Sequence, residues 1–173
     1  MVRSLQFQNM LSTDRLGLDI LNVDDYDFIA SLVNSKGWIE NIGDRNIHTK
    51  SDAKAYINKI LKTENFFYWV VRLKDACTPI GIISFIKRSY LEHFDIGFAF
   101  LPAYYRKGYA YEAAKEVLNM VSKLPEHNVV LATTILSNSN STRLLIKLGF
   151  TFEKEIEIEN EKLLVYLYGR ILD

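Results

Sequence analysis

The sequence has little of what would set it apart from ordinary globular proteins. Its one cysteine, Cys77, cannot form an internal disulfide, which fits a reducing compartment. The most apolar stretches, Phe66–Val71 and Ile80–Ile86, are far shorter than the roughly 18 residues typical of a membrane span. The first residues lack the apolar core of a signal peptide. We therefore expect a cytoplasmic protein that does not insert into a membrane.

An excess of either charge is also absent, because Lys and Arg total 21 and Asp and Glu total 21. A chain of zero formal net charge has no overall field that would attract nucleic acid. The histidines His48, His93 and His127 are scattered and lack the paired spacing of metal ligands, so no metal site is predicted. Neither of the glycine-rich phosphate loops of nucleotide-binding folds occurs, which disfavours a nucleotide-binding protein of another fold.

The features that are present predict one α/β domain, since 173 residues that are 49% apolar can bury a sizeable core. Residues 1–12 carry little pattern and are expected to be an N-terminal lead-in to a domain at 13–173. Strands are predicted near 15–21, 66–73, 80–87, 93–101, 129–134, 150–158 and 162–168. Helices are predicted at 22–34, from Ser51 or Asp52 to about 61, at 106–122 and at 138–148, with a loop at 35–50. Because strands and helices are interleaved, we expect a mixed, mostly antiparallel sheet with helices on both faces.

The helix predicted at 106–122 has the clearest pattern, and the turn before it has the composition of an anion site. A helix N-terminus presents unpaired N–H groups and a partial positive charge. Gly108 has no Cβ, so the backbone can approach a phosphate closely, and Arg106 and Lys107 add positive charge. The alternative is an ordinary loop with two solvated cations.

The wider sequence around this turn resembles the GNAT acetyltransferases, most closely the branch of the Rim-type ribosomal-protein N-acetyltransferases. The resemblance lies in Asp95–Pro102, the Tyr105–Ala110 turn and Glu112-Ala113-Ala114, and it extends over roughly residues 13–170. Gly108 and Ala110 fill the last two fixed places of the family motif Gln/Arg-x-x-Gly-x-Gly/Ala, whereas Tyr105 stands where Gln or Arg is usual. The segment from Asn138 through Ser141 to Gly149-Phe150 is similar to the family signature Asn-x-x-Ser…Lys-x-Gly-Phe.

The resemblance implies acetyl-CoA as the acyl donor, with coenzyme A as product. It assigns the cofactor to a set of residues on one strand, the following turn and a later helix: Phe98, Phe100, Leu101, Arg106, Lys107, Gly108, Tyr109, Ala110, Asn138 and Ser141. A backbone N–H between Phe98 and Leu101 would polarise the acetyl carbonyl. In the family this strand is splayed, which requires a local irregularity, and Gly97 is a candidate cause of it. Asn138 has a second interpretation as the N-cap of its helix, and both roles can hold at once.

The sequence indicates the residues that bind the acceptor substrate less clearly than those that bind the cofactor. The segment from Gly37 to Arg45 resembles the family's acceptor loop and indicates Trp38, Asp44 and Arg45 as substrate-binding residues; the alternative is a solvated loop with Trp38 packed on the core. Catalytic candidates are Glu92 as base, with Asn138 and Tyr105 near the thiol. Asp95 and His93 flank the same strand, so the base is left open.

The predicted activity is transfer of an acetyl group from acetyl-CoA to a primary amine, either a small molecule or a protein N-terminus, by direct attack. A covalent route through Cys77 is disfavoured because this residue lies in a predicted turn away from the motifs. The alternative function is a non-catalytic acyl-CoA-binding module of the same fold. The resemblance is compatible with a monomer or a homodimer.

Overall fold

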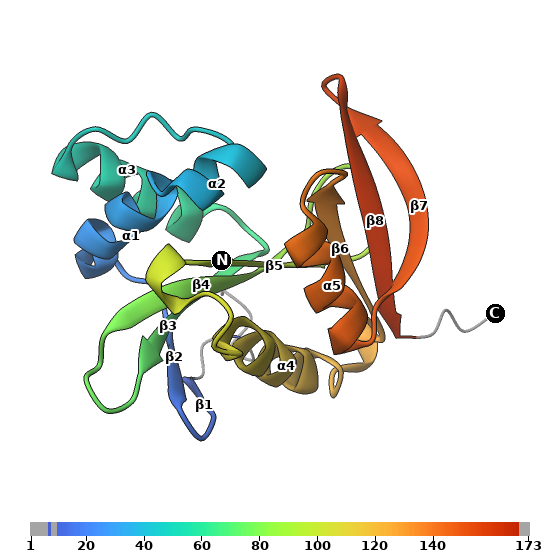
Figure 1. Ribbon diagram of the computed structural model, residues 1–173, viewed down its shortest axis with the longest axis horizontal. Coiled ribbons are helices and arrows are strands. Elements are labelled where there is room, and N and C mark those ends of the chain that lie inside the picture. Colours follow the sequence, from blue (N-terminus) through green and yellow to red (C-terminus); the bar gives the residue numbers. More distant parts are fainter. Residues whose placement is uncertain (1–6, 8–9, 170–173) are drawn as a thin grey trace.

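A computed structural model describes residue 7 and residues 10–169 of the chain. Eight strands form one sheet in the order β1-β2-β3-β4-β5-β6-β8-β7, with helices on both faces (Figure 1). The strands are β1 Leu11–Ser12, β2 Leu16–Ile20, β3 Phe66–Leu73, β4 Pro79–Ile86, β5 Asp95–Phe100, β6 Val129–Ile135, β7 Thr151–Ile158 and β8 Glu161–Gly169. The helices are α1 Tyr26–Val33, α2 Lys36–Asn41, α3 Lys50–Lys62, α4 Tyr109–Val121 and α5 Ser139–Leu148. The α/β fold expected from the sequence is confirmed.

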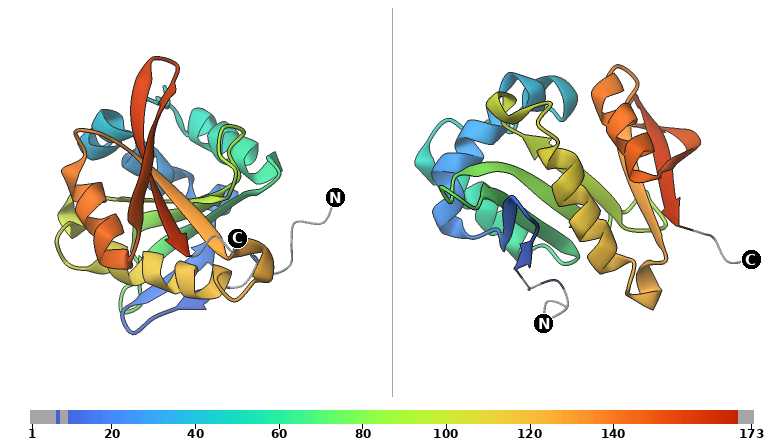
Figure 2. Two further views of the ribbon diagram at one scale, coloured as in Figure 1. Left: turned by 90° about the vertical axis from the view of Figure 1, so that its right-hand side faces the viewer. Right: turned by 60° about the horizontal axis from the view of Figure 1, so that its bottom comes forward.

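The sheet divides between β5 and β6, which are its one parallel pair among the described strands. These two strands are joined at a single residue pair, Asp95 with Leu131. By contrast, β5 pairs with β4 along the whole length of β5, from Asp95 opposite Ile86 to Phe100 opposite Gly81. Beyond Asp95, β5 and β6 therefore diverge, and a splay opens towards their C-terminal ends. The part of the sheet formed by β6–β8 turns away from the rest in Figure 1 and Figure 2.

Each face of the sheet has its own core. Because side chains alternate along a strand, one strand contributes to both cores. On one face, Val117 and Leu118 of α4 and Leu145 of α5 pack against the sheet. On the other face, Leu32 and Ile57 belong to the core beneath α1–α3. The three N-terminal helices and the α4–α5 pair thus cover opposite faces, as Figure 2 shows in its right-hand view.

The structure corrects several predicted boundaries. The loop expected at 35–50 contains α2, because its residue Trp38 is buried in the α1–α3 core and holds this short helix in place. Helix α3 begins at Lys50, since Thr49 and Asp52 form a capping box. Helix α4 begins at Tyr109 rather than Arg106, because a left-handed backbone at Arg106 and Gly108 interrupts the helix before it.

The N-terminal lead-in also contributes to the fold. Phe7 is 3% exposed and packs against the ring of Phe67, with ring centroids 4.3 Å apart. Leu11–Ser12 pairs with β2 as a strand. The expectation of a patternless lead-in is therefore wrong for these residues, while 1–6 and 8–9 lie outside the described residues.

Gly97 is not the cause of the splay. It pairs regularly with Ser84 in the continuous β4–β5 ladder. A Cβ on Gly97 would lie 2.6 Å from the Ser84 hydroxyl, so the glycine allows a close approach between neighbouring strands. The splay arises instead from the divergence of β6.

Candidate active site

Two helix N-termini lie at the open end of the splay. Strand β5 leads through residues 101–108 to α4, and β6 leads through residues 136–138 to α5. Because the two strands are parallel, both connections emerge at the same edge of the sheet. The two helices also pack against one another. The topology thus brings together the two motif segments that the sequence places 30 residues apart, from Gly108 to Asn138.

The first of these termini is the α4 turn, defined as residues 105–111. Gly108 has φ +82° and Arg106 has φ +60°, both in the left-handed region. The first hydrogen bond within the helix runs from the Glu112 N–H to the Gly108 carbonyl at 3.0 Å. No side chain caps the helix, and the N–H groups of residues 108–111 donate to no other described residue. This set of free donors has the character of an anion site.

The backbone donors of β5 alternate between its two neighbours. The Leu101 N–H donates to the Ile80 carbonyl of β4 at 2.9 Å, so it is not available to a ligand in the splay. In an antiparallel ladder, the N–H groups of Phe98 and Phe100 then point the other way, towards β6. The structure therefore narrows the predicted range of carbonyl-polarising donors and removes Leu101 from it.

The N-terminus of α5 is capped as the sequence predicts. The Asn138 Oδ1 atom accepts a hydrogen bond from the Ser141 N–H at 3.1 Å. The Asn138 Nδ2 group donates to no other described residue. At the other end, Gly149 ends the helix with φ +97°. The cap therefore uses one side of the Asn138 amide and leaves its donor side free beside the splay.

Polar side chains that are buried or half-buried lie on the face of the sheet covered by α1–α3. We call Tyr56, Tyr68, Ser84, Arg88 and Asp95 the polar cluster. Tyr68, Ser84 and Gly97 are opposite one another on β3, β4 and β5. The Asp95 carboxylate is 2% exposed, and both of its oxygens accept hydrogen bonds from the Arg88 Nε, at 3.0 and 2.9 Å.

Burial controls the ionisation of this cluster. Desolvation raises the pKa of Asp95 above its ordinary value, although the neighbouring Arg88 charge opposes the shift. Burial likewise raises the pKa of Tyr68, and the charge of Asp95 adds to the effect. The pKa of Tyr56 is also raised by burial, against the opposing charge of Arg45. The cluster thus combines protonated phenols with one carboxylate whose proton affinity is increased.

The predicted acceptor residues have different surroundings. Trp38 is 5% exposed and belongs to the core beneath α1–α3, as its alternative interpretation expects. The Arg45 guanidinium lies 5.8 Å from the centroid of the Trp38 ring. Asp44 uses Oδ1 to accept the Asn46 N–H at 2.7 Å in an exposed turn. Of the three, Arg45 is the one that interacts with the polar cluster, through Tyr56.

The predicted catalytic residues are likewise separated by the fold. Glu92 is exposed in the connection between β4 and β5, whereas Asp95 lies on β5 and is buried. Tyr105 is 47% exposed, and its hydroxyl occupies the space that a Cβ on Gly37 of α2 would need. Partial burial raises the pKa of Tyr105, and the charge of Glu40 adds to this shift. This phenol is therefore suited to donating a proton rather than accepting one.

The sequence indicated no role in a site for Tyr68, Ser84 or Arg88. Each lies in or just after an apolar strand without a motif of its own. Only the strand register, which places Ser84 beside Gly97 and Arg88 beside Asp95, brings them together. A register depends on pairing between distant segments, so local sequence gave no signal.

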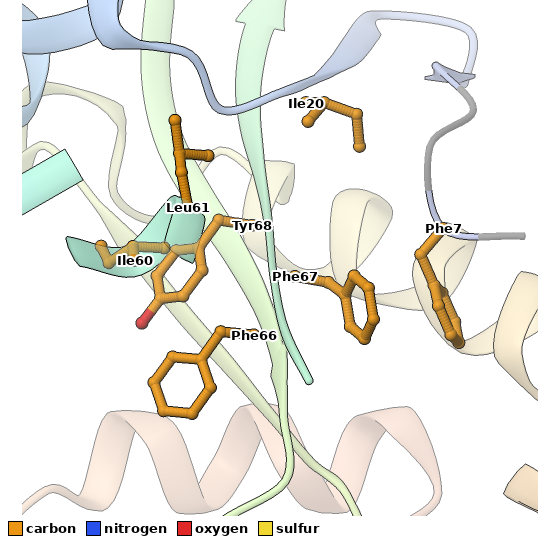
Figure 3. A pocket seen from close by; sticks show the side chains of 7 residues that line it. All are labelled: Phe7, Ile20, Ile60, Leu61, Phe66, Phe67 and Tyr68. Carbon is orange, nitrogen blue, oxygen red and sulfur yellow. The ribbon is translucent and has the colours of Figure 1, made fainter. Parts of the chain in front are cut away.

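Other parts of the described chain show fewer features of a binding site. A small apolar cavity of about 10 Å³ lies near the start of β3 (Figure 3), and it has room for roughly one water. Its lining is Phe7, Ile20, Ile60, Leu61, Phe66, Phe67 and Tyr68. Within residues 7 and 10–169, no three His, Cys, Asp or Glu side chains are grouped as metal ligands. Among the helices described, none is long and apolar enough to cross a membrane.

This fold is shared with the solved structures of acetyltransferases. A family model for the acetyltransferase (GNAT) domain matches residues 15–151. The chain belongs to the GNAT acetyltransferase family, and the resemblance inferred from the motifs is confirmed.

Individual relatives agree with this assignment. An uncharacterized N-acetyltransferase of Bacillus subtilis, YnaD, is 31% identical over 163 residues, which is 92% of this chain and 95% of YnaD. The structure of a GNAT-family acetyltransferase from Bacillus anthracis has a TM-score of 0.77 at 24% identity, over 92% of this chain and 98% of that one. A ribosomal-protein-S5-alanine acetyltransferase from Vibrio fischeri has a TM-score of 0.75 at 20% identity, over 92% and 96%. The two structural likenesses show the shared fold.

Proposed function

We propose that this protein transfers an acetyl group from acetyl-CoA to a primary amine by direct attack. The observation that carries the proposal is the row of free N–H groups at residues 108–111, beside a splay between β5 and β6. Free donors at a helix start suit the pyrophosphate of coenzyme A, and a splay next to them suits its pantetheine arm. No other described part of the chain combines these two features.

The donor's phosphates would lie on the α4 turn. Its backbone N–H groups and the charges of Arg106 and Lys107 would hold the pyrophosphate, with Tyr109 and Ala110 in the same first turn. The pantetheine arm would then extend along β5 into the splay. The Phe100 N–H lies nearer the α4 turn, and the Phe98 N–H lies deeper in the splay. Asn138 would donate to the arm through Nδ2, with Ser141 one turn further along α5.

The reaction needs a stabilised oxyanion, a deprotonated amine and a proton for the departing thiolate. We assign the oxyanion to the Phe98 N–H, the deeper of the two free β5 donors. Asp95 is better placed than Glu92 or His93 to accept the amine proton, directly or through water, because it lies on β5 and burial raises its pKa. Tyr105, whose pKa is also raised, would supply the thiolate's proton.

The acceptor would enter from the α1–α3 face, past Arg45 and the loop containing Asp44. Both a small amine and a peptide N-terminus fit this assignment. The Vibrio fischeri acetyltransferase, which has a similar fold, is named for an alanine of ribosomal protein S5. A peptide beginning with alanine therefore belongs in the panel of acceptors to be tested.

The test is release of coenzyme A thiol from acetyl-CoA with a panel of amines and peptides. Turnover on any acceptor supports the proposal. Binding of acetyl-CoA without turnover on every acceptor would support the alternative, a non-catalytic acyl-CoA-binding module. Absence of acetyl-CoA binding would refute both.

One substitution tests the proposal that Asp95 accepts the proton of the amine. Asp95→Asn should lower kcat by about 10²–10⁴-fold, the usual range for a general base, while acetyl-CoA still binds. Asp25→Asn is a matched control, because Asp25 is 6% exposed and paired with Arg72 away from the splay. Both substitutions disturb a buried ion pair. Asp95 is therefore supported as the general base only if kcat falls in Asp95→Asn and not in Asp25→Asn. Equal kcat in the two variants would exclude it.

A further inference from the structure

Hydrogen bonds from the far edge of the sheet hold the α4 turn. We call Thr13, Arg15 and Glu112, which make them, the clamp. Arg15 lies in the connection between β1 and β2, and its Nε and Nη2 atoms bond Glu112 Oε2 at 2.7 and 2.6 Å. The Arg15 Nη1 atom donates to the Lys107 carbonyl at 3.1 Å. One guanidinium therefore holds both the first turn of α4 and the peptide that precedes Gly108.

Glu112 is held from more than one direction. Its carboxylate also accepts hydrogen bonds from the Thr13 hydroxyl and from the Arg15 backbone N–H, the latter at 3.2 Å. Partial burial alone would raise the pKa of Glu112, but these hydrogen bonds and the Arg15 charge hold it below its ordinary value. The carboxylate is thus a fixed anchor for Arg15 at neutral pH.

The clamp determines the direction of one cofactor-binding donor. The Lys107 carbonyl and the Gly108 N–H belong to the same peptide, and no cis peptide occurs among the described residues. In a trans peptide, the C=O and N–H groups point in opposite directions. Because the Lys107 carbonyl points towards the Arg15 Nη1 atom, the Gly108 N–H points in the opposite direction. The Arg15 guanidinium also lies 4.5 Å from the centroid of the Tyr109 ring, which further restricts its position.

We infer that Arg15 is a positioning residue for the cofactor, acting through Lys107 and Glu112 to preset the N–H groups that bind the pyrophosphate. This inference rests on the proposed acetyl-CoA-binding function. The left-handed backbone at Arg106 is a conformation that surrounding contacts must maintain, and the clamp supplies such contacts. Its components come from segments 97 residues apart in the sequence, so no local motif contains it.

The experiment measures coenzyme A affinity by titration calorimetry for the wild-type chain, Arg15→Lys and Glu112→Gln. Lysine keeps the charge but lacks the planar fork through which separate nitrogens of Arg15 bond the carbonyl and the carboxylate. We expect each variant to weaken coenzyme A binding on the order of tenfold, the equivalent of one charge-assisted hydrogen bond. The KM for S-acetylpantetheine, which lacks the phosphates held by the turn, should stay unchanged.

Glu112→Gln separates positioning from simple charge. If Arg15 contacted the phosphates directly, removing the negative charge of Glu112 would leave coenzyme A affinity unchanged or raise it. The clamp requires the opposite, because Arg15 loses its anchor. Unchanged or tighter binding by Glu112→Gln therefore overturns the inference.

A matched control is Arg72→Lys, since the Arg72 Nε bonds Asp19 at 2.9 Å in an ion pair outside the turn. It should shift the melting temperature without changing coenzyme A affinity. If Arg15→Lys does not fold, Thr13→Val removes one hydrogen bond to Glu112 and should weaken binding by a smaller factor. A wild-type chain that binds no coenzyme A refutes the proposed function itself; a wild type that binds, with variants that bind equally well, refutes only the clamp.

Discussion

Replacing Gly108 by alanine tests the α4 turn with the smallest possible change. At φ +82°, a side chain is strained by about 1–2 kcal/mol in the left-handed region. The added Cβ itself has space, because its nearest neighbour would be the Arg15 Nη2 atom at 3.4 Å. The variant should therefore fold, with a melting temperature lowered by about 2–8 °C for a chain of this size.

The effect on the cofactor should be larger than the effect on stability. Alanine relieves its strain by rotating the backbone, and that rotation redirects the N–H groups on either side of Gly108. Loss of one hydrogen bond to a charged phosphate costs about 1.5–3 kcal/mol, which raises the Kd for coenzyme A roughly 10–150-fold. Titration calorimetry measures this Kd directly, and a thermal melt measures stability in the same sample.

Gly149→Ala is the matched control for this substitution. Gly149 has φ +97° at the end of α5, and its Cβ would make an ordinary contact of 3.5 Å with Tyr168. It should lose similar stability and keep its coenzyme A affinity. A Gly108→Ala protein that melts lower but binds coenzyme A as tightly as the wild type would show that the phosphates do not lie on the α4 turn.

Two further substitutions test buried side chains, and a third at the surface is their control. His127 is 8% exposed, and burial lowers its pKa below 6.5, so the unfolded chain binds a proton at a higher pH than the folded one. The free energy of unfolding should therefore fall as the pH decreases below about 6.5 and level off below the folded-state pKa. Urea unfolding at pH 5.5 and 7.5 should show that His127→Phe removes this part of the pH dependence. An unchanged pH dependence in the variant would contradict its origin in His127. Leu118→Ala, at a side chain 2% exposed between α4 and the sheet, should lose about 2–5 kcal/mol. Ile146→Ala, at a side chain 59% exposed, should change stability by about 0.5 kcal/mol or less, and equal losses in the two variants would contradict the packing.

Local sequence signals were sufficient for much of the fold. The apolar spacing of α4, the Asn138 cap and the terminal Gly149 of α5 each depend on residues within a turn or two of one another. The sequence also located the turn at Gly108, because a helix start with a glycine and two cations has a local meaning. It did not reveal α2, whose stability depends on the burial of Trp38 in a core made by other helices.

The sequence by itself determined the order of most elements, the two helix starts beside the splay and the family to which the chain belongs. These are encoded in neighbouring residues, so they can be found without knowing the fold. Only the tertiary structure decided that the Leu101 N–H is bound to Ile80, that Asp95 is buried against Arg88, and that Arg15 reaches Glu112. Each of these facts depends on strand register and on contacts between distant segments. The Gly108 turn was thus visible in the sequence, but the clamp that sets its geometry exists only once β1, β2 and α4 have packed together.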